Sequence, residues 1–179
     1  MLFSKMGVAT NSSRVIYVKA DASGANNGTS WLDAFTSLTD GLAIANNGDE
    51  IWIAHGTYYP TTGTDRSQSF VLKNGVSLHG SFTGSERSKN ERFPLSNNRL
   101  TLLSGDIGRL GDMSDNSYHV VKAENVENIN FDHIDVKYGN ANGITQEDKK
   151  GGGIALISNN ESKANINFIN QTDFFLIKL

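Results

Sequence analysis

NINFDHIDVKYG (residues 128–139) alternates apolar and polar residues on both sides of a short polar break. Phe131 comes before the break, and Ile134 and Val136 follow it. A period of two is typical of β-strands, whose successive side chains point to opposite faces. We therefore predict two short strands with a corner at 132–133, which together form part of one turn of a coil.

Similar short runs continue along the chain, and Gly, Asn, Asp or Ser ends almost every one. Five apolar residues in these runs are spaced 25 or 26 residues apart: Ile53, Leu78, Leu103, Ile129 and Ile154. Repeats of this length are the signature of solenoids, in which each turn buries its apolar face on its neighbours. The spacing predicts an all-β solenoid of roughly four or five coils, each made of short strands joined by turns.

A β-sandwich is the competing architecture, because it also contains many short strands at regular intervals. Asn74-Gly75, between two apolar runs, is a hairpin signal that a sandwich would use. The chain contains 20 Asn and 18 Gly but only 2 Pro. Asn and Gly enter the left-handed backbone conformation at low cost, so this composition suits many tight corners. The repeat spacing favours the coil.

One segment changes from a period of two to a helical period. In residues 30–45, apolar side chains recur at spacings of three and four, at Trp31, Phe35, Leu38, Leu42 and Ala45. Ser30 is a suitable N-cap residue. We predict a capping helix over 30–45, within an amino-terminal cap at 14–50. Residues 1–13 form a disordered leader, and the coils occupy 51–179.

Composition and charge exclude several classes of protein. The net charge of −3 provides no electrostatic case for nucleic acid. No apolar run is long enough for a transmembrane helix, and the first residues lack the apolar core of a signal peptide. The absence of Cys excludes disulfides and thiolate metal sites.

The chain also resembles a known family. The matching segments are IYVKADASGANNGTSWLDAFTSLTDGLAIANNGDEIWIAHGTYYP (16–60), SFVLKNGVSLHGSF (69–82), TLLSGDIG (101–108), NSYHVV (116–121), FDHIDVKYGNANG (131–143) and GGGI (151–154). They resemble the opening of right-handed parallel β-helix proteins of pectin-lyase-like fold from bacterial surfaces, related to polymorphic outer-membrane proteins and autotransporter passengers. The resemblance implies a right-handed parallel β-helix whose helix closes its amino-terminal end.

The chain departs from this family at both ends. Family members usually begin with a signal peptide and continue for more coils, whereas this chain ends in FFLIKL (174–179). An exposed FFLI edge requires cover. We therefore expect a truncated chain, with further coils or a partner chain at the carboxy-terminal edge.

Asp135, Lys137 and His133 are the candidate catalytic residues. Asp135 and Lys137 alternate with inward-pointing apolar residues, so we expect both to point outward, and Asp132 and His133 to lie at the corner. The resembled family often has Gly at the position of His133 and Thr at that of Asp135. The cluster is therefore no family catalytic motif, and surface and corner positions are the alternative interpretation.

Asp106, Asp112 and Asp115 form a carboxylate-rich loop that has oxygen ligands for calcium. The loop lacks the fixed spacing of a calcium-binding motif, so a solvated turn is the alternative. Polysaccharide lyases of the resembled fold commonly use calcium-binding carboxylates with an Arg or Lys base, and no such motif is recognisable here. Calcium is thus the one cofactor that we consider.

Aromatic residues at strand ends are the candidate ligand-binding residues. Trp52, Tyr58 and Tyr59 have rings that can stack on a sugar, although packing in the core or under a loop is the alternative. We interpret His119, beside Val120 on a predicted strand, as a structural residue that is stacked or hydrogen-bonded. The four His residues are too scattered to form a metal site.

We expect a non-catalytic module that presents loops for adhesion or glycan binding, with polysaccharide or host-surface glycan as partner. The resemblance places it outside the bacterial cell or on its surface. Two alternatives remain open: a polysaccharide lyase or glycoside hydrolase, which would cluster outward Asp, Arg or Lys on adjacent rungs, and a fragment without independent function. Fold alone does not choose between them.

Overall fold

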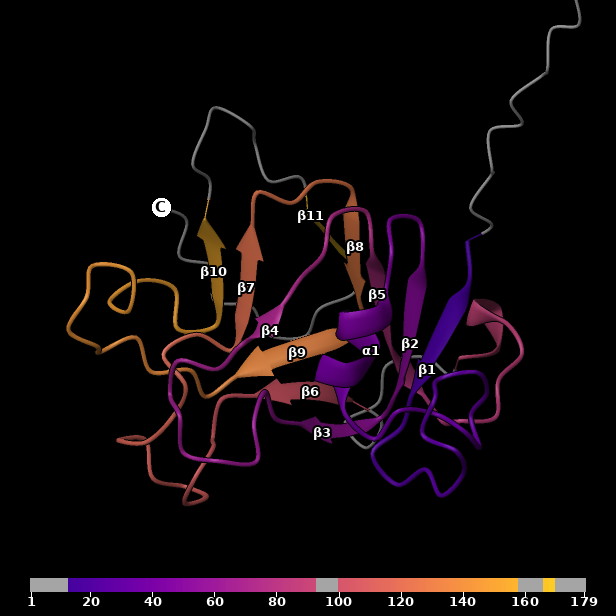
Figure 1. The fold of residues 1–179 in the computed structure, drawn as a ribbon, viewed down its shortest axis with the longest axis horizontal. Coiled ribbons are helices and arrows are strands. Elements are labelled where there is room, and N and C mark those ends of the chain that lie inside the picture. Colours follow the sequence, from indigo (N-terminus) through magenta and orange to yellow (C-terminus); the bar gives the residue numbers. More distant parts are fainter. Residues whose placement is uncertain (1–12, 93–99, 158–165, 170–179) are drawn as a thin grey trace, which may run out of the picture.

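Short strands return to three sheets in a fixed cyclic order (Figure 1). The structure is a computed structural model that describes residues 13–92, 100–157 and 166–169. Its elements are β1 (Val15–Val18), α1 (Leu38–Ile44), β2 (Glu50–Ala54), β3 (Gly56–Tyr58), β4 (Phe70–Val71), β5 (Ser77–Phe82), a 3-10 turn (Lys89–Glu91), β6 (Thr101–Ser104), β7 (Val121–Glu124), β8 (Ile129–Asp132), β9 (Ile134–Lys137), β10 (Ile154–Ile157) and β11 (Ile166–Ile169).

All named strand pairs are parallel. The five-stranded sheet has the order β1-β2-β5-β8-β11, and two three-stranded sheets have the orders β3-β6-β9 and β4-β7-β10. The chain therefore runs through one strand of each sheet per coil and completes three coils among the described residues, with β11 opening a fourth. Figure 1 shows β1, β2, β5 and β8 standing side by side, with β3, β6 and β9 stacked across them. The predicted parallel β-helix is confirmed.

The interior contains ladders of apolar side chains in register. In the five-stranded sheet, Ile16 is paired with Ile51, Ile51 with Leu78, Leu78 with Phe131, and Phe131 with Phe168. The first four side chains of this ladder are fully or almost fully buried. Each buried side chain of this size stabilises the fold by about 1.5–3 kcal/mol relative to an exposed one. The ladder thus accounts for the stacking of the coils.

The predicted repeat of 25 residues is wrong, although the architecture is right. Leu78 lies in the five-stranded sheet, whereas Leu103 lies in β6 and Ile154 in β10, so the evenly spaced residues belong to different sheets. True partners such as Ile51 and Leu78 are 27 residues apart, and the next two intervals in that ladder are 53 and 37. Surface loops of unequal length separate the strands, so the coils have no constant period.

Some of the many Asn residues form left-handed corners between strands. Asn125 and Asn128, on either side of the turn between β7 and β8, have φ angles of 49° and 58°. His133 separates β8 from β9 with a φ of 57°. These angles lie in the left-handed region, which Asn adopts more readily than most residues. The corner predicted at 132–133 is therefore confirmed at His133.

The helix is shorter than predicted. It spans Leu38–Ile44 rather than 30–45, and Ser37, not Ser30, caps it by accepting a hydrogen bond from the Thr39 N–H at 3.2 Å. The preceding residues form a turn and a bridge to β1, in which Phe35 and Val18 are partners. Backbone pairing with an existing strand therefore replaces the helix in this stretch.

The helix covers the apolar end of the first coils. It packs against β1, β2 and β4 through a face that includes Leu38 and Leu42, both buried. Gly41 allows this approach, because a Cβ atom there would lie 3.0 Å from Val18 Cγ2. No helix in the described ranges is long and apolar enough to cross a membrane. The FFLI segment and residues 1–12 of the predicted leader lie outside the described residues.

Candidate functional site

Among the described residues, the largest connected group of acidic and basic side chains lies on the outer face of the five-stranded sheet. His79 of β5 and Asp132 of β8 occupy partner positions, and their Nδ1 and Oδ2 atoms are 3.4 Å apart. Arg92 donates from Nη2 to the same carboxylate oxygen at 2.8 Å. His133 bonds the second oxygen of Asp132 through Nδ1. One carboxylate thus joins three basic side chains.

A second carboxylate extends this group to the neighbouring strand. Glu50 of β2 accepts from Lys89 Nζ at 2.6 Å and from the indole N–H of Trp52 at 2.9 Å. Its Oε2 lies 3.9 Å from Nε2 of His79. The side chains of Glu50, His79 and Asp132 therefore form a line across three adjacent coils.

A chain segment covers this group from outside. Residues 83–92 supply Lys89 and Arg92, and Glu86 of the same segment accepts a hydrogen bond from Trp31 Nε1 through its backbone carbonyl at 2.9 Å. His79 and Asp132 are only 6% and 5% exposed. Because both side chains are closed off from solvent, the group does not form an open catalytic site. Its hydrogen bonds to Lys89 and Arg92 hold the segment to the sheet.

One of the predicted ligand-binding rings is buried against neighbouring strands. Trp52 is stacked on Phe82 with ring centroids 4.7 Å apart and planes 11° apart, and it is buried. The guanidinium of Arg92 lies 5.0 Å from the Phe82 ring centroid, within cation–π range. Trp52 is therefore buried among other aromatic rings and has no free face for a sugar.

The ion pairs change the acidity of both carboxyl groups. Burial acts to raise the pKa of Asp132, but hydrogen bonds led by that of His79 outweigh burial and hold the pKa well below its usual range. Burial likewise acts to raise the pKa of Glu50, and the hydrogen bond from Lys89 contributes most to lowering it. Both groups are therefore charged at neutral pH, as ion pairs require.

Two of the three predicted catalytic residues lie together on another sheet. Asp135 and Lys137 of β9 line a groove of about 310 Å³ on the outer face of the β3-β6-β9 sheet, where Lys137 Nζ lies 3.5 Å from Asp135 Oδ2. His133 is not with them, because it pairs with Asp132. The partner of Asp135 on the next strand is Leu102, whose side chain is neither acidic nor basic.

The predicted calcium loop uses its carboxylates internally. Asp106, Asp112 and Asp115 each accept a backbone N–H from their own loop, at 2.8–2.9 Å. In the part of the chain that the structure describes, no group of three or more His, Asp or Glu side chains is arranged to hold a metal ion. The three carboxylates thus stabilise turns and are not gathered as ligands.

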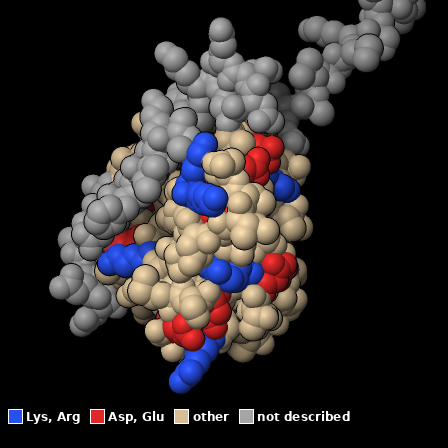
Figure 2. Space-filling view, turned by 90° about the vertical axis from the view of Figure 1, so that its left-hand side faces the viewer, with Lys and Arg blue, Asp and Glu red and all other residues tan. Residues whose placement is uncertain are grey.

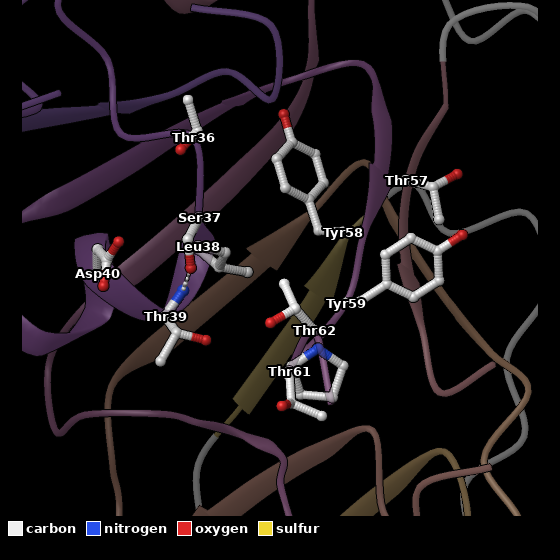
Figure 3. Close-up of a pocket in the computed structure, with 11 residues that line it drawn as sticks. Thr36, Ser37, Leu38, Thr39, Asp40, Thr57, Tyr58, Tyr59, Thr61 and Thr62 are labelled. Atoms are coloured by element: carbon white, nitrogen blue, oxygen red, sulfur yellow. Dashed lines mark hydrogen bonds between the residues drawn. The ribbon is translucent and has the colours of Figure 1, made fainter. Parts of the chain in front are cut away.

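An open cleft lies between the segment at the start of α1 and the segment after β3 (Figure 3). It has a volume of about 360 Å³, and most of the residues that line it carry a hydroxyl group. Figure 3 shows Asp40 at one side and Tyr59 at the other. The hydroxyl-bearing residues around them are Thr36, Ser37, Thr39, Thr57, Tyr58, Thr61 and Thr62.

The two adjacent tyrosines of this cleft differ in their surroundings. Tyr58 is buried, its hydroxyl donates to the Ala54 carbonyl at 2.9 Å, and burial raises the pKa of its phenol. Tyr59 is 38% exposed. Of the three rings predicted to contact a ligand, Tyr59 alone is free to do so, and Tyr58 serves the core.

His119 is buried, as expected of a structural residue. Its side chain lies inside the corner before β7, and Nδ1 is 3.1 Å from the Gly151 carbonyl oxygen. The bond joins this corner to the segment before β10. His119 thus makes the kind of hydrogen bond that the sequence predicted for it.

Sequence reasoning missed the partnership of His79 with Asp132. Alternation in SLHG and in NINFD places both residues on the outer face, because Leu78 and Phe131 point inward. That signal was present, but it becomes useful only when β5 and β8 are known to be neighbours. Arg92, which lies between those strands in sequence, has no comparable signal.

Charge does not mark a site on the face drawn in Figure 2. Basic and acidic side chains are interspersed there rather than gathered into a patch of one sign. Comparison with known protein families, with curated proteins and with solved structures gives no match.

Proposed function

We propose that this chain is a non-catalytic β-helix module, displayed on or secreted from a bacterial cell, that binds glycan in the cleft of Figure 3. The observation that carries the proposal is the exposed ring of Tyr59 beside a lining of hydroxyl groups. The family resemblance of the sequence supports the location and the pectin-lyase-like fold. A rigid solenoid suits this role, since its loops vary without disturbing the core.

The lining of the cleft matches the surface chemistry of a sugar. An aromatic ring stacks on the C–H face of a pyranose, and a threonine hydroxyl both donates to and accepts from sugar hydroxyls. Asp40 adds a carboxylate acceptor at the opposite side from Tyr59. The cleft volume of about 360 Å³ lies at the small end of the range for ligand sites. It fits a short stretch of a glycan rather than a long chain.

A polysaccharide-degrading activity receives less support. Asp135 and Lys137 share a groove, but a hydrolase requires two carboxylates on either side of the scissile bond. Leu102, and beyond it Thr57, occupy the positions in register with Asp135 on the neighbouring strands. The clustering of outward acids and bases expected of an enzyme occurs instead around Asp132, where it is buried.

Replacing Tyr59 with alanine is expected to weaken glycan binding about tenfold, because one stacking face is lost. A panel of soluble neutral and acidic polysaccharides first identifies a ligand by affinity electrophoresis. Calorimetric titration of that ligand then compares wild type with Tyr59→Ala.

Tyr138→Ala is the matched control for this experiment. Tyr138 is 54% exposed and lines the groove of Asp135 instead of the cleft. It should leave the dissociation constant unchanged. Two results would contradict the proposal: a wild-type chain that binds nothing on the panel, or a ligand lost in Tyr138→Ala and retained in Tyr59→Ala.

A further inference from the structure

A separate cavity lies between His119, the 144–150 loop and β10. Its volume is about 260 Å³, and apolar surface predominates in its lining. Three residues of β10 form one wall, Ala155, Leu156 and Ile157. Glu147 and Lys150 also line it, and both are exposed. The cavity therefore combines an apolar wall, one buried imidazole and two opposite charges.

The imidazole of His119 has one nitrogen without a partner. The residue is 1% exposed, and Nε2 has no hydrogen-bond partner. Nδ1 faces the Gly151 carbonyl oxygen, which can only accept. In the neutral ring Nδ1 therefore carries the hydrogen, and Nε2 is an acceptor. A buried acceptor that lacks a donor is unfavourable, so a ligand that supplies a donor is stabilised there.

The loop over the cavity is held in place by its own bonds and by a distant arginine. Thr145 and Asp148 exchange two hydrogen bonds, of 2.6 and 3.0 Å. Arg66 donates to the Asn140 carbonyl at 3.1 Å and to Asn142 Oδ1 at 2.5 Å, just before the loop. The cavity is thus part of a defined structure.

We propose that this cavity binds a small molecule with an apolar body and one hydroxyl donor, of the phenol class, through a hydrogen bond to His119 Nε2. The apolar body packs on the wall formed by β10. Because Glu147 and Lys150 have opposite charges, the rim favours neither an anion nor a cation. This site is independent of the glycan cleft and does not rest on the function proposed above.

Phenol and anisole form the test pair, because they share a ring but only phenol donates a hydrogen bond. Titration of the full chain is followed by ¹H–¹⁵N spectra of its amides and of its histidine rings. Phenol is expected to shift the Ala155 and Ile157 amides saturably and to move the His119 Nε2 resonance. Its dissociation constant should be about tenfold lower than that of anisole, the worth of one hydrogen bond to a buried acceptor.

Two variants assign the effect to Nε2. His119→Asn keeps an N–H group for the Gly151 carbonyl but removes Nε2, so phenol and anisole should then bind equally. His55→Asn is the matched control, since His55 Nδ1 also lies 3.1 Å from a carbonyl, that of Phe82, and does not line this cavity. The His55→Asn chain should keep the difference in affinity between phenol and anisole.

Equal affinity of phenol and anisole for wild type would overturn the proposal, as would an absence of saturable shifts at β10. Both outcomes are decided on the wild-type chain, so they stand even if His119→Asn does not fold. If a folded His119→Asn chain still bound phenol more tightly than anisole, the acceptor would lie elsewhere, and the proposal would also be overturned.

Discussion

Asp132→Asn is expected to lower the free energy of unfolding by about 3 kcal/mol, because it leaves Arg92 without its buried counter-charge. The side chains of both partners are largely buried, at 8% and 11% exposed, so water cannot replace the lost bond at low cost. The same change weakens the hydrogen bonds to His79 and His133. Urea denaturation followed by circular dichroism at pH 7 measures the loss.

The deficit should depend on pH in a defined direction. The folded pKa of Asp132 is depressed below its unfolded value of about 3.9. Its contribution to stability is therefore present above the unfolded pKa and is lost as the pH falls through the folded pKa. The difference between wild type and Asp132→Asn should be complete at pH 5–7 and should shrink below about pH 4.

Asp21→Asn is the control for this prediction. Asp21 also forms a short ion pair, with Lys19 at 2.6 Å, but its side chain is 83% exposed. Exposed pairs contribute little, so this variant should resemble wild type. If both variants lost equal stability, or if the deficit of Asp132→Asn were the same at pH 3 as at pH 7, the role given to Asp132 would be wrong.

Gly80→Ala is expected to destabilise the fold by about 3 kcal/mol through overpacking. A Cβ atom at Gly80 would lie 2.8 Å from both Ile134 Cγ1 and Thr101 Cβ, and it would overlap the His133 carbonyl oxygen. That carbonyl belongs to the corner between β8 and β9 and accepts a hydrogen bond from Ser81 Oγ at 3.2 Å. The clash therefore falls on backbone that cannot move alone. Thermal unfolding measures the effect.

Gly63→Ala separates this clash from the general cost of replacing glycine. Its nearest atom would be Thr61 Oγ1 at 3.5 Å, an ordinary contact. The substitution should change stability by less than about 0.5 kcal/mol. If the Gly80→Ala chain were as stable as the Gly63→Ala chain, β5 would not pack against the corner at His133 as described.

The β-helix architecture was predictable because the alternation of apolar and polar residues is a local signal. Phe131 and Ile134 are spaced as inward residues on either side of a break, and both are buried, with His133 at the corner. The coil length was not predictable in the same way. A 53-residue interval separates Leu78 from Phe131, and no local signal reveals how much loop a coil carries.

The helix shows how tertiary pairing overrides a local pattern. Trp31 and Phe35 are spaced as in a helix, yet Phe35 bonds to β1 and Trp31 packs edge-on against the Tyr17 ring, with centroids 4.8 Å apart. Burial against existing strands is stabilising, whereas an isolated helix of this length is marginal. The sequence pattern cannot report this competition.

The candidate site residues were also predictable only where local signals suffice. Sequence reasoning identified Tyr59, which is exposed in a cleft, and also Trp52, which is not. Trp52 is buried because the rings of Tyr17 and Phe82, from neighbouring strands, pack against it. These are long-range contacts, so no spacing in the sequence reveals them.

Disulfide trapping tests the parallel stacking of the coils most directly. Val71 of β4 and Lys122 of β7 are register partners, both on the outer face, and Val71 is 53% exposed. Partner Cα atoms in neighbouring strands are about 4.8 Å apart, within the range that a disulfide spans. Since the chain has no Cys, the introduced pair has no competing thiols.

The parallel register predicts that Val71→Cys with Lys122→Cys forms an intramolecular disulfide on mild oxidation, detected by intact mass and a mobility shift on non-reducing gels. Val71→Cys with Glu124→Cys should remain reduced, because two further residues along β7 place the Cα atoms roughly 8 Å apart. Failure of the first pair to close, or equal closure of both pairs, would contradict the stacked parallel β-helix.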